Sequence, residues 1–214
     1  MEKNKKYYMQ SRSEMFGFIP ENAKRILEVG CGAGNFSFQL IKEDRETWGV
    51  ELCEKASIEA AEKLFKVINK SLDDALAELP ENYFDVIILN DILEHLLFPW
   101  DDLQHLKSKL TEDGVVVSSV PNVRYIKNLY KLIFKRDWKY VDEGILDSTH
   151  FRFFTKISIK ALYENNGYTV QKIKGINATK SISYIALGGL FNILFLGTQS
   201  DIFYTQFATI AKKK

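Results

Sequence analysis

Residues 28–34 read Glu-Val-Gly-Cys-Gly-Ala-Gly, and this stretch decides the fold. It follows a strand candidate, Arg25-Ile26-Leu27, and leads into a helical pattern over Asn35–Lys42. Glycine has no Cβ and tolerates positive φ, so a glycine-rich turn between a strand and a helix lets backbone N–H groups approach a ligand near the positive end of the helix dipole. The stretch therefore predicts a strand–turn–helix unit that holds a nucleotide-like small molecule.

Strand and helix patterns alternate around this unit. Continuous apolar runs such as 86–89 and 115–117 are typical of a parallel sheet buried on both faces, and ligands are then expected at the carboxyl ends of the strands. The pattern predicts a doubly wound α/β domain over residues 1–214. The expected strands are Arg25–Cys31, Thr47–Leu52, Lys66–Asn69, Phe84–Asn90, Gly114–Val120, Gly167–Ile176 and Phe203–Ile210, and the expected helices are Asn35–Lys42, Glu54–Phe65, Trp100–Leu110 and Lys156–Asn165.

Composition excludes several classes of protein. The 214 residues carry 29 basic and 28 acidic side chains, a net charge of +1, so no overall field attracts nucleic acid. Basic runs occur only at the ends (Lys3, Lys5 and Lys6, and 212–214), where solvated tails are expected. Two cysteines make no disulfide framework, and no Cys-x-x-Cys pair suggests a metal site. With no secretory segment at the start, we expect a cytoplasmic protein.

Two segments interrupt the alternation and are expected to act as lids. Residues 123–154 mix basic and aromatic side chains, which suits single-stranded RNA, a sugar phosphate, an anionic membrane interface or a solvated amphipathic helix, although the neutral overall charge speaks against RNA. Residues 181–200 are uncharged, but their apolar core, Tyr184–Leu196, has only 13 residues and is followed by a strand. Runs of this size are buried or interfacial more often than spanning. A peripheral membrane contact or a homodimer contact through 181–200 stays open.

The cofactor is indicated by carboxylates around the glycine turn. A dinucleotide fingerprint would place its third glycine at position 35, where this chain has Asn35. Glu28 precedes the first glycine by two positions, and Glu51 ends the second expected strand, 21 residues after Gly30. A carboxylate there can accept both ribose hydroxyls. The combination is more specific than the glycines alone.

These motifs resemble those of the class I S-adenosylmethionine-dependent methyltransferases. The acidic-x-Gly-x-Gly-x-Gly motif matches residues 28–34, the acidic end of strand two matches Glu51, and the motif around strand four matches Phe84–Asp91. The resemblance covers about residues 7 to 176. It implies a seven-stranded, mostly parallel sheet with an antiparallel C-terminal strand, and S-adenosylmethionine as methyl donor.

A closer likeness lies in Val120–Val123 and Glu143–Thr155, which look like the branch of quinone-biosynthesis and sugar- or polysaccharide-associated O-methyltransferases. This implies O-methylation of a small-molecule, glycan-linked or lipid-linked acceptor. Three alternatives are N- or C-methylation of another metabolite, a non-catalytic donor-binding scaffold that docks through 181–200, and a nicotinamide-dependent oxidoreductase.

The resemblance also implies a donor site. Asp91 is expected to accept from the donor's amino group, and Glu28 to do so through water or to organise the loop. Tyr8 and Arg12, one helical turn apart, would close over the donor or belong to an exposed leader helix. Where the family has Gly-Asp facing adenine, this chain has Lys70 and Ser71; either the Ser71 hydroxyl and Leu72 backbone, or a shifted Asp73, replaces that contact. The expected donor-binding residues are Tyr8, Arg12, Glu28, Gly30, Cys31, Gly32, Gly34, Glu51, Leu52, Ser71, Leu72, Asn90, Asp91 and Ile92.

Three histidines are candidates for chemistry, because a hydroxyl acceptor must lose its proton to a group whose pKa is near the working pH. His95 follows strand four and is expected to point at the methyl group or to cap the next helix. His150 lies in the insertion that would roof the acceptor pocket, as a base, an acceptor ligand or a structural group. His105 is expected to be solvated on a helix flank.

Overall fold

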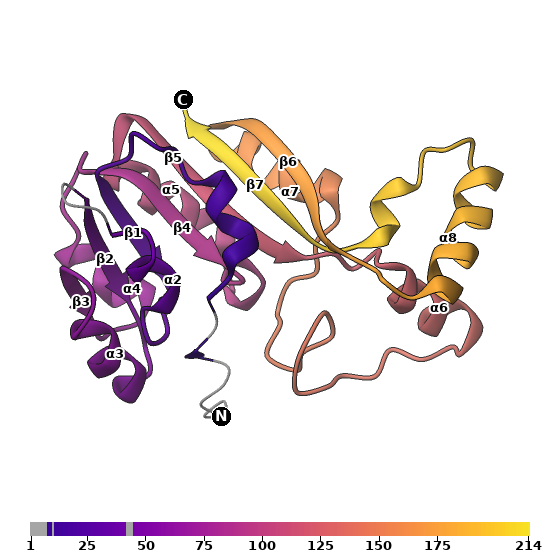
Figure 1. Cartoon of the computed structure of the whole chain (residues 1–214). Coiled ribbons are helices and arrows are strands. Elements are labelled where there is room, and N and C mark those ends of the chain that lie inside the picture. Colours follow the sequence, from indigo (N-terminus) through magenta and orange to yellow (C-terminus); the bar gives the residue numbers. More distant parts are fainter. Residues whose placement is uncertain (1–7, 10, 42–44) are drawn as a thin grey trace.

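The computed structural model describes residues 8–9, 11–41 and 45–214; the basic run of Lys3, Lys5 and Lys6 and the expected helix end at Lys42 lie outside this part. One sheet runs through the described chain in the order β3-β2-β1-β4-β5-β7-β6. The strands β1 to β5 pair in parallel, whereas β7 is antiparallel to β5 and β6. The prediction of a mostly parallel seven-stranded sheet is confirmed (Figure 1). The strands are β1 (Arg25–Val29), β2 (Glu46–Val50), β3 (Lys66–Ile68), β4 (Phe84–Asn90), β5 (Leu110–Pro121), β6 (Tyr168–Ala178) and β7 (Tyr204–Lys213).

Helices and short 3-10 turns connect these strands. The longer helices carry recognisable start signals: α5 has Pro99 in its first turn, and α7 begins with a capping box between Thr155 and Ser158. The helices are α2 (Asn35–Phe38), α3 (Glu54–Ala61), α4 (Leu72–Ala75), α5 (Pro99–Lys109), α6 (Ile126–Phe134), α7 (Lys156–Asn165) and α8 (Ile182–Leu194), and the 3-10 turns are η1 (Ser13–Phe18), η2 (Leu76–Glu78), η3 (Leu93–His95) and η4 (Ser200–Phe203).

Several element ends differ from the sequence prediction for local reasons. β1 ends at Val29 because Gly30 has φ of +68°. α3 ends at Ala61 rather than near Phe65, since the Phe65 N–H instead donates to the carbonyl of Thr47 and starts β3 beside β2. β5 begins at Leu110, four residues before Gly114, because Leu110 pairs with Phe84, and the register shift before the next pair, Val86 with Val115, places the extra residues in β5.

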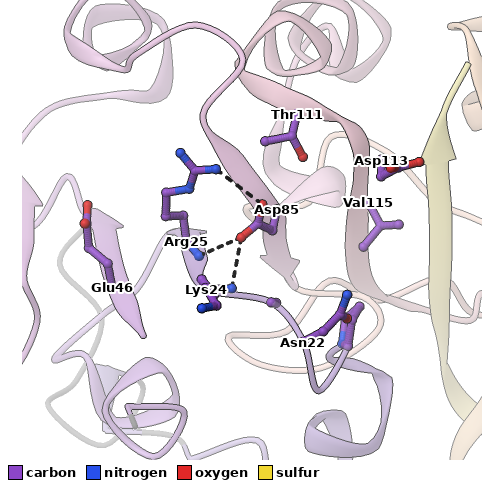
Figure 2. Close-up of a pocket in the computed structure, with 10 residues that line it drawn as sticks. Asn22, Lys24, Arg25, Glu46, Asp85, Thr111, Asp113 and Val115 are labelled. Carbon is purple, nitrogen blue, oxygen red and sulfur yellow. Dashed lines mark hydrogen bonds and ion pairs between the residues drawn. The ribbon is translucent and has the colours of Figure 1, made fainter. Parts of the chain in front are cut away.

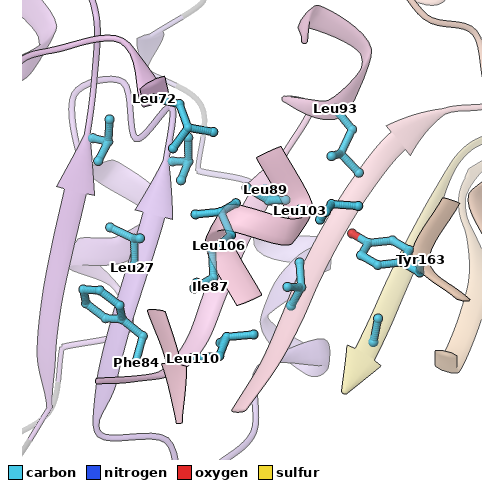
Figure 3. Close-up of a cluster of buried hydrophobic side chains, with 14 of the residues drawn as sticks. Leu27, Leu72, Phe84, Ile87, Leu89, Leu93, Leu103, Leu106, Leu110 and Tyr163 are labelled. Atoms are coloured by element: carbon cyan, nitrogen blue, oxygen red, sulfur yellow. The ribbon is translucent and has the colours of Figure 1, made fainter. Parts of the chain in front are cut away.

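Alternate residues of the central strands point into two separate cores, one on each face of the sheet. This explains why the strands are continuously apolar in sequence. Ile87 and Leu89 point to the face covered by α4, α5 and α7, where they meet Leu103, Leu106 and Tyr163 (Figure 3). Their neighbours on β4, Val86 and Ile88, point to the opposite face. There they pack with side chains of η1 and α2, including Met15, Phe18 and Phe36.

An aromatic side chain near the start of α5 lies at the surface. Trp100 is 39% exposed, whereas Leu103 and Leu106 of the same helix are fully buried. The guanidinium carbon of Arg152 lies 5.3 Å from the centroid of its ring, and Phe98 contacts its edge. Trp100 therefore packs against Arg152, near the end of the first insertion.

The two insertions leave the sheet at one end of the molecule (Figure 1). The first contains α6 and the second contains α8, and β7 returns from α8 into the sheet beside β5. No helix in the described part of the chain combines the length and apolar character needed to cross a bilayer.

The core on the α5 face provides a stability prediction. Leu106→Ala should lower the free energy of unfolding by about 2–5 kcal/mol, because Leu106 is fully buried and its truncation leaves a cavity between α5 and the sheet. Urea unfolding followed by circular dichroism measures this. The matched control is Ile157→Ala on α7, where the side chain is 82% exposed and little change is expected. Equal losses in both variants would contradict the assignment of this core.

Candidate functional site

A cavity of about 1110 Å³ opens at the carboxyl ends of β1, β2 and β4. The loops that follow these strands line the cavity, as expected for an open α/β sheet. Of the residues predicted to form the site, Gly34 and His150 are absent from its lining. Those that do line it are Tyr8, Arg12, Glu28, Gly30, Cys31, Gly32, Glu51, Leu52, Ser71, Leu72, Asn90, Asp91, Ile92 and His95.

A smaller cavity of about 500 Å³ lies at the opposite, amino ends of the strands (Figure 2). Its central carboxylate, Asp85, accepts the backbone N–H groups of Lys24 and Arg25, each at 2.9 Å. Asp85 thus fastens the start of β1 to β4. Because these hydrogen bonds give Asp85 a structural role, we place the functional site in the larger cavity.

The glycine turn is packed against its neighbours through its backbone. The N–H groups of Gly30 and Cys31 both donate to the carbonyl of Val50, at 2.7 and 3.2 Å. The Ala33 N–H donates to the carbonyl of Tyr8, and the Gly34 N–H to that of Cys31. The remaining N–H of the turn, on Gly32, donates to the Glu51 carboxylate. The expectation that these groups face a ligand is therefore wrong, because each already has an acceptor within the protein.

Glu51 joins the loops that follow β1 and β2. Its Oε2 accepts the Gly32 N–H at 2.9 Å, and its Oε1 accepts the Cys53 N–H at 2.8 Å. The residue is 7% exposed and lines the cavity. A carboxylate has about four acceptor sites, so two backbone donors fix its orientation and leave capacity for two further donors. Beside it, the Leu52 side chain is 73% exposed at the cavity.

The conformation of Gly32 allows this approach. Its φ is +53°, and a Cβ at this position would lie 2.7 Å from the carbonyl oxygen of Tyr8. Any side chain would be strained and would push the Tyr8 segment away from the turn. Glycine is therefore required at position 32 by both backbone conformation and space.

The Glu28 side chain joins β1 to α2 and to the end of β4. It is 3% exposed and accepts hydrogen bonds from the Ser37 hydroxyl at 2.7 Å and the Asn90 side-chain amide at 3.4 Å. Burial raises the pKa of Glu28 from 4.5 to about 7, against these hydrogen bonds, which lower it. Of the two roles expected for Glu28, its contacts support the structural one. The Oδ1 of Asn90 is buried without a hydrogen-bond partner among the described residues, at the edge of the cavity.

Asp91 belongs to a polar network between β4, β5 and β7. Its Oδ1 accepts from Ser119 at 3.0 Å and from Gln206 at 2.8 Å, and its other oxygen is ion-paired with Arg12. Arg12 also donates to the Ser119 hydroxyl at 2.8 Å and lies 3.0 Å from Glu14. The two oxygens of Asp91 thus already accept three protein donors, so its expected role as acceptor for the donor's amino group stays a prediction, and the Asn90 Oδ1 is a further acceptor at this edge of the cavity.

Arg12 does not continue a helix from Tyr8. Its φ of 44° is left-handed, so the expectation that the two residues occupy successive turns of a leader helix is wrong. Both nevertheless line the cavity, since the Arg12 side chain is held by Asp91 and Tyr8 covers the glycine turn. The tertiary contacts, rather than helical spacing, bring them to the site.

The segment after β3 closes another wall of the cavity. The Ser71 hydroxyl caps α4: it accepts the Asp74 N–H at 3.2 Å and donates to the Asp74 carboxylate at 2.7 Å. Asp73 lines the cavity together with Asp102 of α5. Burial, and after it the nearby Asp73 carboxylate, raises the pKa of Asp102 to about 6. Ser71, Leu72 and Asp73 all line the cavity, and both expected adenine contacts, the Ser71 hydroxyl with the Leu72 backbone or a shifted Asp73, stay predictions.

The rings of His95 and His150 contact each other, although the two residues are far apart in the sequence. Their rings are 4.6 Å apart between centroids and stand edge to face. The Nδ1 of His95 lies 3.2 Å from the carbonyl oxygen of Thr149, and that of His150 lies 3.1 Å from the carbonyl of Ile145. A carbonyl only accepts, so we assign the hydrogen to Nδ1 in both rings and the lone pair to Nε2.

Glu94 lies beside the two rings. It is 1% exposed, and neither of its carboxyl oxygens has a hydrogen-bond partner among the described residues. Burial raises the pKa of Glu94 to about 8. Ligand atoms of Glu94, His95 and His150 lie within 4.8 Å of one another. Imidazole and carboxyl groups in such a cluster can transfer protons or bind a divalent metal ion.

Sequence reasoning missed several cavity residues because no motif marks them. Glu94 lies outside the motif over Phe84–Asp91, although its place between Leu93 and His95 could have indicated a buried carboxyl. Thr149 and Phe151 reach the cavity because the N–H groups of Phe151 and Arg152 donate to the Glu94 carbonyl. His105 remains exposed, as expected, at the cavity rim. Further lining residues are Phe36, Val50, Cys53, Glu54, Leu96, Leu97, Phe98 and Asp101.

Comparison with known proteins identifies the family. A family model described as a methyltransferase domain matches residues 1–173. The chain is 24% identical over 196 residues to the ubiquinone biosynthesis O-methyltransferase of Vibrio cholerae, covering 89% of this chain and 77% of that protein. It is 25% identical over 190 residues to the protein of the same name from a Shewanella species, covering 86% and 75%.

Solved structures share the fold. A SAM dependent methyltransferase from Archaeoglobus fulgidus superposes with a TM-score of 0.66 at 23% identity, covering 98% of this chain and 95% of that one. An S-adenosylmethionine dependent methyltransferase from Mesorhizobium loti gives a TM-score of 0.64 at 14% identity, covering 94% and 96%. At these identities the likeness establishes the architecture.

The buried Glu28 predicts a pH dependence of stability. Its folded pKa of about 7 exceeds the ordinary value of 4.5, so its stability contribution is fully present below pH 4.5 and is lost as pH rises through 7. Glu28→Gln cannot ionise. Between pH 5 and pH 8 the variant should therefore gain up to about 3 kcal/mol relative to the unmodified chain.

Chemical unfolding of both proteins at several pH values measures this difference. Glu112→Gln, at an exposed position, is the control and should follow the unmodified chain at every pH. A constant difference between the Glu28→Gln variant and the unmodified chain from pH 5 to pH 8 would contradict the buried ionisation.

Proposed function

The chain belongs to the methyltransferase domain family, and from this premise we propose that it transfers the methyl group of S-adenosylmethionine to a hydroxyl oxygen of a small-molecule, glycan-linked or lipid-linked acceptor. The observation that carries the proposal is the Glu51 carboxylate held by the Gly32 N–H at the edge of a cavity large enough for two ligands. Transfer to oxygen is supported by the relatives named O-methyltransferases.

The residues present fit this donor. The Glu51 carboxylate accepts two backbone N–H groups and would accept the ribose hydroxyls with its remaining lone pairs. The exposed Leu52 side chain would pack on the adenine ring. The partnerless Oδ1 of Asn90 would accept from the amino group. Because the Ser71 hydroxyl is engaged in the cap of α4, Asp73 would face the exocyclic nitrogen of adenine.

The saturated glycine turn argues against a nicotinamide dinucleotide. A pyrophosphate needs free N–H donors at such a turn and at the helix that follows. Here the five N–H groups of residues 30–34 donate within the protein, and one of their acceptors is the negatively charged side chain of Glu51. A ligand that carries no phosphate suits this wall better.

For the transfer itself, the chain has to align the acceptor and take up its proton. S-adenosylmethionine, when bound, supplies a methyl group already activated by the sulfonium charge, so alignment provides much of the acceleration. His95 lines the cavity, and the contact of its Nδ1 with the Thr149 carbonyl holds the ring there, so we propose it as the base. His150 lies outside the lining and packs on the His95 ring, which makes it a positioning residue.

Donor binding is tested with S-adenosylhomocysteine by calorimetry. Gly32→Ala should abolish detectable binding, because the added Cβ displaces Tyr8, and Glu51→Gln should weaken binding by about tenfold or more through the loss of a charged acceptor. Gly17→Ala is the matched control: Gly17 has open space around it and does not line the cavity. Unchanged affinity in both site variants would overturn the proposed donor site.

Catalysis is tested with a panel of phenolic, sugar and amine acceptors. His95→Gln should lower kcat by about 10²–10⁴-fold and remove the ascending limb of the pH profile, while affinity for S-adenosylhomocysteine stays the same. His150→Gln should lower kcat less and shift that limb. Lys156→Gln, at an exposed position of α7 outside the cavity lining, is the control.

Other outcomes of this panel separate the alternatives. Donor binding without turnover on any acceptor would favour a scaffold, and turnover of amines alone would favour N-methylation. Activity that depends on an added divalent ion and disappears with a chelator would assign the cluster of Glu94, His95 and His150 to metal binding instead of proton transfer.

A further inference from the structure

The two insertions form one lobe apart from the sheet, which we call the α6–α8 lobe and define as residues 123–140 and 181–200 (Figure 1). α6 and α8 contact each other, with the rings of Tyr130 and Tyr184 at 6.0 Å between centroids. The lobe is anchored to the body by Arg124, which forms an ion pair with Asp201 at 2.8 Å. Because α6 and α8 contact each other, the two insertions form one unit rather than two separate loops.

This lobe exposes large apolar side chains on both of its helices. The end of α8 is the most extreme part, since Ile193 is 73%, Leu194 71% and Leu196 92% exposed. On α6, Ile133 and Phe134 are more than half exposed. Contiguous apolar surface on a folded protein marks a contact with a partner or a membrane. Further exposed apolar side chains of the lobe are Leu132, Ile182, Ile185, Leu190 and Phe195.

Positive charge accompanies this apolar surface. Residues 123–140 contain six basic side chains and one acidic one, and residues 181–200 contain no charged side chain. The net charge of the whole chain is +1, so the rest of the protein is net acidic. Apart from Arg124, which is paired with Asp201, the basic residues are exposed. These exposed cations are Lys127, Lys131, Lys135, Arg136 and Lys139.

We propose that the α6–α8 lobe docks the protein onto an anionic lipid bilayer, with α8 lying in the interface and the cations of α6 on the headgroups. Helices that combine exposed apolar side chains with neighbouring Lys and Arg bind in this way, and the charge selects anionic lipids. α8 has 13 residues, about 20 Å at 1.5 Å per residue, which is shorter than the ~30 Å hydrocarbon core. It can therefore lie on the bilayer but not cross it.

Charge favours lipid over a second copy of the chain. In a symmetric dimer the same patch faces itself, so the five exposed cations of one lobe would meet those of the other. Such like charges repel, whereas the headgroups of an anionic bilayer neutralise them. The bilayer thus satisfies the apolar and the charged parts of the lobe together.

Docking would also place the cavity near the bilayer. The first insertion carries α6 and, further along, Thr149 and Phe151 of the cavity lining. An acceptor anchored in lipid would then reach the site from the surface to which the lobe binds. The binding proposal itself does not depend on methyl transfer, because it concerns a surface that can be tested without donor or acceptor.

The test is co-sedimentation of the full chain with vesicles of phosphatidylcholine alone and of phosphatidylcholine with phosphatidylglycerol. We expect binding to the anionic vesicles that weakens as salt is raised, and much weaker binding to the neutral ones. The variant Lys131→Glu/Lys135→Glu should reduce binding to anionic vesicles by about tenfold or more. Ile193→Asp/Leu194→Asp should reduce it on both kinds of vesicle, by placing charge in the apolar surface.

The matched control is Lys156→Glu/Ile157→Asp on α7, which changes an exposed cation and an exposed apolar side chain away from the lobe and should bind as the unmodified chain does. Circular dichroism and S-adenosylhomocysteine binding check that each variant is folded. Absence of binding to anionic vesicles, or equal losses in the control, would overturn the proposal. A concentration-dependent dimer that Ile193→Asp/Leu194→Asp dissociates, without vesicle binding, would overturn it in favour of a second copy.

Discussion

The contact between the Glu51 carboxylate and the backbone of the glycine turn is the constraint on which the site depends. One carboxylate oxygen accepts from Gly32 and the other from Cys53, so a single side chain holds two loops in register at the carboxyl edge of the sheet. The contact exists only because Gly32 has no Cβ, and because β1 and β2 pair in parallel so that both loops emerge on the same edge. A buried carboxylate with backbone donors is also costly to replace, since a neutral side chain leaves a donor unsatisfied.

This constraint changes the chemical role of the glycines. A glycine-rich turn is commonly read as a set of free N–H donors for an anion. In this protein the N–H groups of the turn are used to build the wall of the cavity, against Val50, Tyr8 and Glu51. What the turn offers a ligand is a surface without side chains next to a carboxylate. Such a wall suits a cationic, hydroxyl-bearing nucleoside better than a pyrophosphate.

The second functional feature comes from a contact between distant segments. The carbonyl of Glu94, just after β4, accepts the N–H groups of Phe151 and Arg152, and this brings His150 onto His95. Both rings then direct Nδ1 to backbone carbonyls, so the backbone sets their tautomers. The insertion that supplies His150 also carries α6, so the histidine pair and the α6 part of the exposed lobe belong to one insertion, whereas α8 belongs to the other.

The amino-acid sequence by itself determined the sheet, the position of the site and most of its donor-side lining, because these follow from local rules. Apolar runs give buried strands, glycines give the turn, and the spacing of Glu51 from Gly30 follows from one strand–helix–strand unit. Tertiary structure alone decided which polar groups remain available: Asp91 is taken by Arg12, Ser119 and Gln206, whereas Asn90 is left with a buried acceptor. It also joined Glu94, His95 and His150, and exposed the end of α8. Hydrogen bonds between residues more than fifty positions apart leave no periodicity in a sequence, so only the folded chain shows them.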